Sequence, residues 1–472
     1  MSKKQFLYLF IILFLIFFIL GTATVGKNTD PFSQFLKSLL PDKTKVFLKK
    51  TVFAIPTLFQ QNAEQSLKIK KLSKDIGFLK SELLKLTDTM PKTQTKEIIS
   101  KDKKKYELTY YKLNLPSHYD WGLKPVAYIE QTKDYIYLTS GNGNFIKLRK
   151  NQIGTNKLNY ETIKTNIENL ISDEQFYDSY VLSIKDLFIK ENKIYFSFGN
   201  LKDECFYIKI FRSDLNQETF KFEKFFEHKE CKKDRTGMNF QHIGGRIVSF
   251  KDNKILLSVG DFGDITTSQN KDSIFGKIIS IDLANNNFEI ISTGSRNAQG
   301  LYYDKSNDVI LNTEHGPTGG DEVNVNVSPS TDFIENFGWP NASYAFSANQ
   351  ITGKEFGIID PPGSHKKFGF VEPVKYFTPS IGISEIIKVS KEFNSEARND
   401  FFVNALGFEE QIAEGDQSIH HIRLSDDYSK VEYEDVIQLK ERIRDIIYLA
   451  DYNSYLLVLE TVPALGLLKL KK

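Results

Sequence analysis

Four short segments of the chain gather polar residues whose types and spacing suit catalysis or ligand binding. His242, which stands before Gly-Gly, could be a general base, because a neutral imidazole has a pKa near physiological pH, or could only form a turn. Residues 294–301 carry an Arg-Asn pair, which taken alone binds a carboxylate or caps a turn. In residues 314–324 (EHGPTGGDEVN), carboxylates and turn carbonyls suit a hard cation such as Ca2+ or belong to a tight bend. Arg442 and Arg444 share one face of a predicted strand and suit an anionic ligand or a structural salt bridge.

The elements that must position these segments are short β-strands. The chain has 472 residues, of which 40% are hydrophobic and 13% aromatic, and its 38 Phe and 22 Tyr favour pleated sheets. A module of strand, Asn- or Asp-containing turn and strand recurs six times. The copies span residues 126–148, 183–215, 244–283, 298–326, 384–427 and 443–472. This repetition predicts an all-β, six-bladed β-propeller with functional loops around one mouth of its channel; a pair of β-sandwiches is the alternative.

Taken together, the polar segments resemble a known family. The strings HIGGR with a later GD, SRNAQGL, EHGPTGGDEVN, NFGWP, PVKYFTPSIG and RIRD are similar to those of soluble glucose dehydrogenase and aldose sugar dehydrogenase, the glucose/sorbosone dehydrogenase family. The likeness covers about residues 235–450. It implies a six-bladed propeller enzyme that oxidises an aldose or related sugar at C1 to a lactone, with pyrroloquinoline quinone (PQQ) and Ca2+ as cofactors.

The resemblance also implies a role for each matched side chain. His242 matches the base that takes the proton of the sugar's anomeric hydroxyl while hydride passes to the quinone. Arg296 and Asn297 match residues that bind the quinone oxygens and would stabilise the negative charge that develops there. Arg442 and Arg444 match the pair that binds the PQQ carboxylates.

Oxygen atoms of the segment that begins at residue 314 match metal ligands of the family. Gly316 and Pro317 match positions whose backbone carbonyls hold the cofactor's Ca2+, which would polarise the quinone as a Lewis acid. Asp321 and Glu322 resemble ligands of a neighbouring structural Ca2+. The resemblance therefore implies two calcium sites built from one segment.

Three positions depart from the family pattern. Residues 180–186 lack the family's Gln near the quinone, and Gln241 stands where an acidic residue often precedes the base. Residues 407–410 (GFEE) bring two carboxylates where the family has a basic residue, and like charges there would oppose the PQQ carboxylates. The alternative function is a catalytically inactive propeller of the same ancestry that binds a ligand or a protein at its mouth.

The N-terminal part of the chain differs from the repeated modules. Residues 1–26 include an uncharged stretch long enough for a transmembrane anchor, although a cleaved signal peptide is the alternative. Residues 27–110 are predicted to form a helical stalk or linker, in which apolar residues within 62–90 would make a self-associating seam or one amphipathic helix. The propeller is assigned to residues 111–472 and is expected on the periplasmic, extracytoplasmic side of the membrane.

Charge and cysteine content limit the function classes further. The chain has 62 Lys and Arg against 60 Asp and Glu, so it lacks the positive excess of a nucleic-acid binder. The family resemblance implies a small-molecule sugar as the partner. Cys205 and Cys231 flank strands of one module and would form a disulfide or remain two buried thiols.

Overall fold

The computed structural model describes one compact unit, which spans residues 80–472. The described residues are 89–113, 126–171, 183–202, 205–233, 242–317, 319–345, 365–407 and 415–471. Within these ranges the chain runs as short antiparallel strands whose apolar residues are buried between neighbouring sheets. Short 3-10 helices connect some of the strands. They are η1 (Lys150–Gln152), η2 (Ile167–Asn169), η4 (His365–Phe368) and η5 (Ala450–Tyr452).

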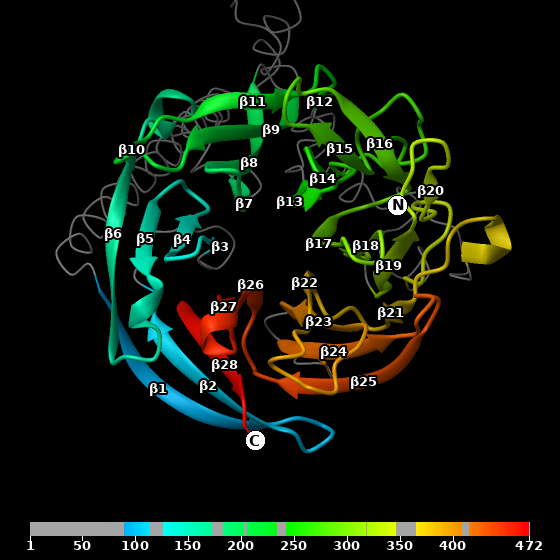
Figure 1. Ribbon diagram of the computed structural model, residues 1–472. Coiled ribbons are helices and arrows are strands. Elements are labelled where there is room, and N and C mark those ends of the chain that lie inside the picture. The colour runs from blue at the N-terminus through cyan, green and yellow to red at the C-terminus, as the bar shows by residue number, and fades with distance from the viewer. Residues whose placement is uncertain are drawn as a thin grey trace, which may run out of the picture. The chain divides into compact units, whose positions relative to one another are not determined.

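Within the described residues, six four-stranded blades stand around a central axis as a propeller (Figure 1), and β1 (Thr89–Ile99) joins blades 1 and 6 into one ten-stranded sheet. From the axis outward, blade 1 consists of β3 (Ala127–Gln131), β4 (Tyr135–Ser140), β5 (Phe145–Arg149) and β6 (Lys157–Thr165). Blade 2 consists of β7 (Ile184–Lys190), β8 (Lys193–Lys202), β9 (Cys205–Asp214) and β11 (Glu223–Glu227). Blade 3 consists of β13 (Gly244–Phe250), β14 (Lys254–Val259), β15 (Lys277–Asp282) and β16 (Phe288–Thr293). Blade 4 consists of β17 (Ala298–Asp304), β18 (Val309–Glu314), β19 (Asp321–Val327) and β21 (Lys375–Phe377). Blade 5 consists of β22 (Ile383–Lys388), β23 (Asp400–Ala405), β24 (Ser418–Leu424) and β25 (Val431–Gln438). Blade 6 consists of β26 (Ile443–Leu449), β27 (Ser454–Leu459), β28 (Ala464–Leu470) and β2 (Lys105–Lys112). Three two-residue strands extend these sheets: β10 (Thr219–Phe220), β12 (Lys232–Lys233) and β20 (Glu335–Asn336). The predicted all-β propeller is confirmed.

The innermost strands of the six blades form a closed ring, because each contacts the innermost strand of both neighbouring blades. In five of these strands, β7, β13, β17, β22 and β26, a β-bulge interrupts the pairing near the first residues. A bulge bends its strand and redirects the side chains beside it. The bulges therefore lie at one end of the ring, where the segments that precede the innermost strands also meet.

A charged cluster lies in the ring just beyond the bulges. Arg246 donates through Nη1 to Oδ1 of Asp186 at 2.7 Å and Oδ1 of Asp445 at 3.2 Å, and its Nε lies 2.5 Å from Oε2 of Glu385. Its guanidinium carbon lies 5.5 Å from the ring centre of Tyr128. These five buried residues come from blades 3, 2, 6, 5 and 1 and form a floor under the mouth.

Hydrophobic packing between neighbouring blades holds the ring together. The buried apolar residues form six clusters, and each cluster fills one of the six interfaces between blades. Between blades 1 and 2, for example, Phe145 and Phe196 pack with Phe220 and Phe222 at ring-centre distances of 4.8 to 6.1 Å. Burying each such ring contributes about 1.5–3 kcal/mol, which explains the high aromatic content.

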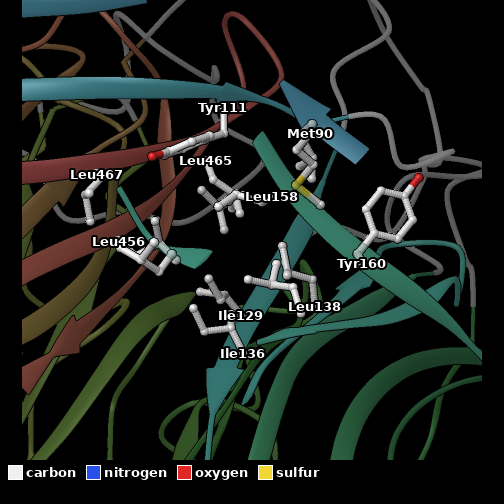
Figure 2. Close-up of a cluster of buried hydrophobic side chains, with 14 of the residues drawn as sticks. Met90, Tyr111, Ile129, Ile136, Leu138, Leu158, Tyr160, Leu456, Leu465 and Leu467 are labelled. Carbon is white, nitrogen blue, oxygen red and sulfur yellow. The ribbon is translucent and has the colours of Figure 1, made fainter. Parts of the chain in front are cut away.

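Strands from both ends of the described chain close the ring. β2 pairs with β28 as the outermost strand of blade 6. β1 (Thr89–Ile99) pairs with β2 and, through its first three residues, with β6 of blade 1. Figure 2 shows Met90 and Tyr111 packed with Leu158 and Leu465 in the cluster between blades 6 and 1. The prediction of a helical stalk to residue 110 is therefore wrong from Thr89 onward. Most β1 side chains are exposed, so the sequence lacked an apolar strand signal there.

The predicted membrane anchor (residues 1–26) and most of the seam (62–90) lie outside the described residues. Within the described ranges, no helix has both the length and the apolar character needed to cross a bilayer. Cys205 and Cys231 form a disulfide, with Cα atoms 5.5 Å apart, so the first of the two cysteine alternatives is confirmed.

Candidate active site

The predicted site residues meet at the end of the ring where the innermost strands begin. His242 precedes β13, Arg296 and Asn297 precede β17, and Arg442 precedes β26, in which Arg444 is the second residue. Nε2 of His242 lies 2.8 Å from Nη2 of Arg296, although the two residues belong to different blades. The structure thus brings the predicted base and the predicted quinone-binding guanidinium into hydrogen-bond contact.

A buried carboxylate fixes the His242 ring. Oδ1 of Asp261 lies 2.9 Å from Nδ1 of His242 and accepts the backbone N–H of Gly263 at 2.8 Å. Oδ2 accepts the indole N–H of Trp339 at 2.8 Å. Because Nδ1 faces an acceptor and Nε2 faces the donor Arg296, the geometry assigns the imidazole proton to Nδ1. The lone pair of Nε2 therefore faces the Arg296 guanidinium.

The backbone around His242 depends on a close approach between two loops. His242 has a positive φ of 63°, and its carbonyl accepts the N–H of Phe262 at 3.2 Å. A Cβ on Gly260 would lie 1.8 Å from the same carbonyl oxygen. Only glycine fits that position, so the Gly-Asp pair at 260–261 both admits His242 and orients its ring.

Electrostatics keep the His242 imidazole neutral. Burial lowers its pKa below the ordinary histidine value, and the positive charge of Arg296 lowers the pKa further, while Asp261 opposes both effects. A neutral imidazole at neutral pH is the form that can accept a proton from a substrate.

Backbone contacts hold Arg296 in the mouth. Oε1 of the buried Glu314 accepts the N–H of Arg296 at 2.6 Å and that of Asn297. Nη1 of Arg296 donates to the carbonyls of His315 at 3.0 Å and Gly316 at 3.2 Å. Its guanidinium carbon lies 5.5 Å from the Trp339 ring centre. The guanidinium thus lies between the imidazole and the carbonyl-bearing turn of blade 4.

The amide of Asn297 has a defined orientation. Its Oδ1 accepts the N–H of Gly244 at 3.2 Å and Nε2–H of Gln299 at 2.8 Å. With its oxygen satisfied by two donors, the NH2 group is the part of the side chain that is available to a ligand acceptor.

The turn between β18 and β19 carries the predicted calcium ligands. A Cβ on Gly316 would lie 2.2 Å from the carbonyl of Gly319, so the tight bend requires glycine. The Gly316 carbonyl faces the Arg296 guanidinium. Oε2 of Glu314 borders the same region, is buried, and has no hydrogen-bond partner among the described residues. Carbonyl and carboxylate oxygens of this kind suit a hard cation.

The two predicted carboxylate ligands are engaged in hydrogen bonds and ion pairs. The oxygens of Asp321 accept the N–H groups of Gly316 at 2.9 Å, Ile381 at 3.1 Å and Ile383 at 2.9 Å, and also the hydroxyl of Ser380. Asp321 therefore ties the turn to blade 5. Oε1 of Glu322 lies 3.1 Å from Nε2 of the buried His365, and its Oε2 accepts the Asn324 amide at 3.3 Å.

No cluster of three or more His, Cys, Asp or Glu side chains within the described ranges has the arrangement of a metal site. The roles of Asp321 and Glu322 in a structural Ca2+ site stay a prediction, as do those of Gly316 and Pro317 in the cofactor's site. Gln241 and residues 408–410 lie outside the described residues.

Arg442 and Arg444 share one buried carboxylate. Nε of Arg442 lies 3.2 Å from Oε2 of Glu460, and Nε of Arg444 lies 2.6 Å from Oε1. Arg442 also donates through Nη1 to the carbonyl of Gly407 at 2.6 Å. Within the described residues Arg444 hydrogen-bonds only through Nε, which leaves both terminal nitrogens for a ligand. The two guanidinium groups carry two positive charges and Glu460 carries one negative charge, so this group of three residues has a net positive charge.

The two sides of the mouth act on a common residue. Burial lowers the pKa of His315, and Asp321 opposes that shift. The positive charges of Arg296 and Arg444 lower the pKa further. Hydrogen bonds join His242 with Arg296, and Glu460 joins Arg442 with Arg444. That the two groups form a single site stays a prediction.

Asp261 and Trp339 are site residues that the sequence reasoning did not single out by role. The Gly-Asp pair after HIGGR and the string NFGWP were the available signals. Neither string predicts the hydrogen bond from the Trp339 indole to the Asp261 carboxylate. That contact exists only because the fold brings the end of β14 and a loop of blade 4 together.

These features define a class of protein: a β-propeller whose mouth carries a neutral imidazole, oriented by a buried carboxylate, together with several guanidinium groups. A family model described as Glucose / Sorbosone dehydrogenase matches residues 181–463, which is more than half of the chain. The chain therefore belongs to the glucose/sorbosone dehydrogenase family, as its motifs predicted.

Two curated proteins match part of the sequence. An uncharacterized protein of Synechocystis sp. is 30% identical over 242 residues, which make up 46% of this chain and 53% of that protein. Aldose sugar dehydrogenase YliI of Escherichia coli is 27% identical over 178 residues, 35% of this chain and 45% of that protein. The chain thus spans about half the length of the curated relatives it matches.

Solved structures share the fold. A crystal structure of glucose dehydrogenase matches with a TM-score of 0.57 and 17% identity, covering 80% of this chain and 100% of that one. The PQQ-bound form of aldose sugar dehydrogenase from Streptomyces coelicolor matches with a TM-score of 0.51 and 16% identity, covering 80% and 98%. At these identities the likeness shows the propeller fold.

Proposed function

We propose that this protein oxidises an aldose or related sugar at C1 to a lactone, with PQQ as hydride acceptor and Ca2+ as a second cofactor. One observation carries the proposal: a neutral imidazole, fixed by a buried carboxylate, presents Nε2 to the mouth beside a guanidinium. Membership of a family named for such dehydrogenases supports it, as do a relative named aldose sugar dehydrogenase and a PQQ-bound protein of the same fold.

The donor set of the mouth fits a quinone that carries carboxylates. The terminal nitrogens of Arg444 are available for a carboxylate, and Arg442 adds positive charge beside them. On the opposite side, Arg296 and the NH2 group of Asn297 offer donors to quinone oxygens. When bound, PQQ would supply the electrophilic quinone that receives hydride from C1 of the sugar.

His242, Asp261 and Arg296 have separate roles in the transfer of the sugar's proton. His242 takes the proton of the anomeric hydroxyl on Nε2. Asp261 keeps the other proton on Nδ1 and stabilises the imidazolium that forms. Arg296 donates to Nε2 in this structure, so proton uptake by His242 requires the guanidinium to turn away from the imidazole when a sugar binds. That movement frees the lone pair and directs the cation toward the developing negative charge.

The calcium part of the proposal depends on oxygen donors of the turn in blade 4. The carbonyls of Gly316 and Pro317 would hold the ion, which would act as a Lewis acid. The Gly316 carbonyl already faces a cation, the Arg296 guanidinium, and Oε2 of Glu314, which has no hydrogen-bond partner among the described residues, lies nearby. These are the oxygen types that Ca2+ prefers.

Titration of the purified full-length chain with PQQ tests the proposal, with and without Ca2+, followed by absorbance and thermal shift. We expect saturable, Ca2+-dependent binding and sugar-dependent reduction of an added electron acceptor. His242→Ala should retain PQQ affinity within about threefold and lose turnover, because general-base catalysis supplies about 100- to 10,000-fold. Absence of PQQ binding by a folded chain would favour the catalytically inactive alternative.

We also propose that residues 1–26 anchor the protein to a membrane with the propeller outside the cytoplasm. The disulfide between Cys205 and Cys231 supports this side, because disulfides persist in oxidising compartments. Protease added to cells whose outer envelope is permeabilised and whose cytoplasmic membrane is intact should degrade the propeller if the proposal is right and spare it if the propeller is cytoplasmic. Self-association through residues 62–90 is tested by the oligomeric state of a chain from which they are deleted.

A further inference from the structure

Lys185 of blade 2 occupies the same place in its strand as Arg444 does in blade 6. It is the second residue of β7, inside the bulge between Ile184 and Asp186, as Arg444 lies inside the bulge between Ile443 and Asp445. In each strand the next residue is the aspartate that binds Arg246. The two aspartates meet on one guanidinium, so the two cationic residues before them lie on the mouth side of the same floor.

Blade 3 leaves room for the Lys185 side chain. A Cβ on Gly245 would lie 2.4 Å from Cβ and 3.1 Å from Cγ of Lys185. Any residue other than glycine at position 245 would therefore clash with the aliphatic part of the lysine side chain. Nζ donates to the hydroxyl of Ser183 at 2.9 Å. Ser183 directly precedes β7, as His242 and Arg442 stand in the segments before β13 and β26. The amine is therefore held at the level of the site residues.

The surroundings of Lys185 favour an anionic ligand. Burial lowers the pKa of its amine to about 7, and the positive charge of Arg444 is the second cause of the shift. Arg444 is thus close enough to act on the amine, although β3 of blade 1 lies between their strands in the ring. A carboxylate placed between two cations is stabilised by both and restores the charged form of the amine.

We propose that Lys185, with Arg442 and Arg444, forms a three-cation pocket for the carboxylates of PQQ, in which the amine of blade 2 receives one carboxylate. This inference rests on the proposed function and extends it, since none of the sequence motifs includes Lys185. It assigns the cofactor's anionic edge to the side of the mouth formed by blades 2 and 6, and its quinone oxygens to Arg296 and Asn297 on blade 4.

Equilibrium binding of PQQ tests this assignment without any measurement of turnover. The variants are Lys185→Met, Lys185→Arg and the matched control Lys190→Met, which removes a lysine from the other end of the same strand. We expect Lys185→Met to weaken PQQ binding about 10- to 100-fold, as loss of a charge-assisted hydrogen bond does, and to flatten the salt dependence of the affinity. Lys185→Arg should recover most of the affinity, and Lys190→Met should stay within about twofold of wild type.

The outcomes separate this inference from the function on which it rests. If wild type binds PQQ and folded Lys185→Met binds it equally well, with the same salt dependence, Lys185 is not part of the pocket while the dehydrogenase proposal stands. If folded wild type does not bind PQQ at all, both proposals fall. Should Lys185→Met fail to fold, Lys185→Gln at matched thermal stability provides the same comparison, and wild-type affinity in that variant overturns the inference.

Discussion

Replacing Asp261 with asparagine keeps the shape of the side chain that fixes His242 and turns one acceptor atom into a donor group. In the wild type, Oδ1 faces Nδ1–H of His242 and the N–H of Gly263, while Oδ2 accepts the indole N–H of Trp339. An asparagine can satisfy only one side of this arrangement. Its NH2 group must face either the indole or the imidazole.

Either orientation has a cost that the structure allows us to estimate. An NH2 group facing the indole leaves the buried donors of the new amide and of Trp339 without acceptors, a loss of about 1–3 kcal/mol in the free energy of unfolding. An NH2 group facing the imidazole forces the His242 proton onto Nε2 and removes the lone pair that takes the sugar's proton. The same Asp-to-Asn change in a serine protease triad lowers kcat about 10,000-fold, so we expect a fall of about 100- to 10,000-fold here.

The assay is steady-state oxidation of a sugar by the PQQ-loaded protein, with PQQ affinity and thermal unfolding measured in parallel. Trp339→Phe is the matched variant, because it removes the indole donor that competes for the acceptor. In the double variant the NH2 group of residue 261 can face the phenyl ring, so the imidazole keeps its proton on Nδ1. We expect the double variant to be more active than Asp261→Asn alone. Wild-type turnover in Asp261→Asn, or no recovery in the double variant, would refute the reasoning.

The pH profile provides a second readout of the same contact. Burial and Arg296 lower the pKa of His242 below its ordinary value, so kcat/KM should fall only on the acid side of about pH 6.5. Asp261 raises that pKa, and its replacement by asparagine should move the acid limb to still lower pH. A limb that moves to higher pH would mean that a different group controls activity.

Two further predictions concern residues that support the site. Arg246→Met should lower the free energy of unfolding by about 3–5 kcal/mol at pH 8, because it leaves three buried carboxylates without their guanidinium. Burial raises the pKa of each of these carboxyl groups, so at lower pH they become protonated and need the guanidinium less. Denaturant unfolding should therefore show a smaller loss of stability for the variant at pH 5 than at pH 8. Equal losses at both pH values would contradict this role of Arg246. Gly260→Ala should abolish turnover and lower thermal stability, because its Cβ would meet the His242 carbonyl at 1.8 Å. Gly263→Ala, which has open space at φ +75°, should cost only about 1 kcal/mol and retain activity; similar losses in both variants would show that backbone strain alone explains them.

The blades and the family motifs could be predicted from the sequence because their signals are local. Strands such as β8 and β27 alternate or bury apolar residues between turn residues, and the polar strings stand directly before innermost strands. The sequence therefore predicts that His242 and Arg296 share one site, and the structure places Nε2 and Nη2 of these residues 2.8 Å apart. The contact between Asp261 and Trp339 was not predicted, because it depends on how two blades are packed.

The N-terminal boundary was predicted wrongly for a related reason. β1 is rich in Lys and Thr and mostly exposed, so its strand structure comes from pairing with β2 and β6 and not from its own composition. The role of Lys185 also depends on distant partners. Its neighbours in the sequence form an ordinary strand, and only the equivalence of its bulge to that of Arg444 brings it to the mouth.

The closure of the ring by β1 and β2 has a consequence for how the protein is made. Tyr106 pairs with Leu470, so blade 6 lacks its outer strand until both ends of the chain are available. β2 is synthesised before β28, so one edge of β2 stays unpaired until β28 has been made. Blade 6 also carries Arg442 and Arg444, whereas His242 and Arg296 lie on blades completed earlier. Blade 6, which carries Arg442 and Arg444, is therefore completed only after β28 has been synthesised.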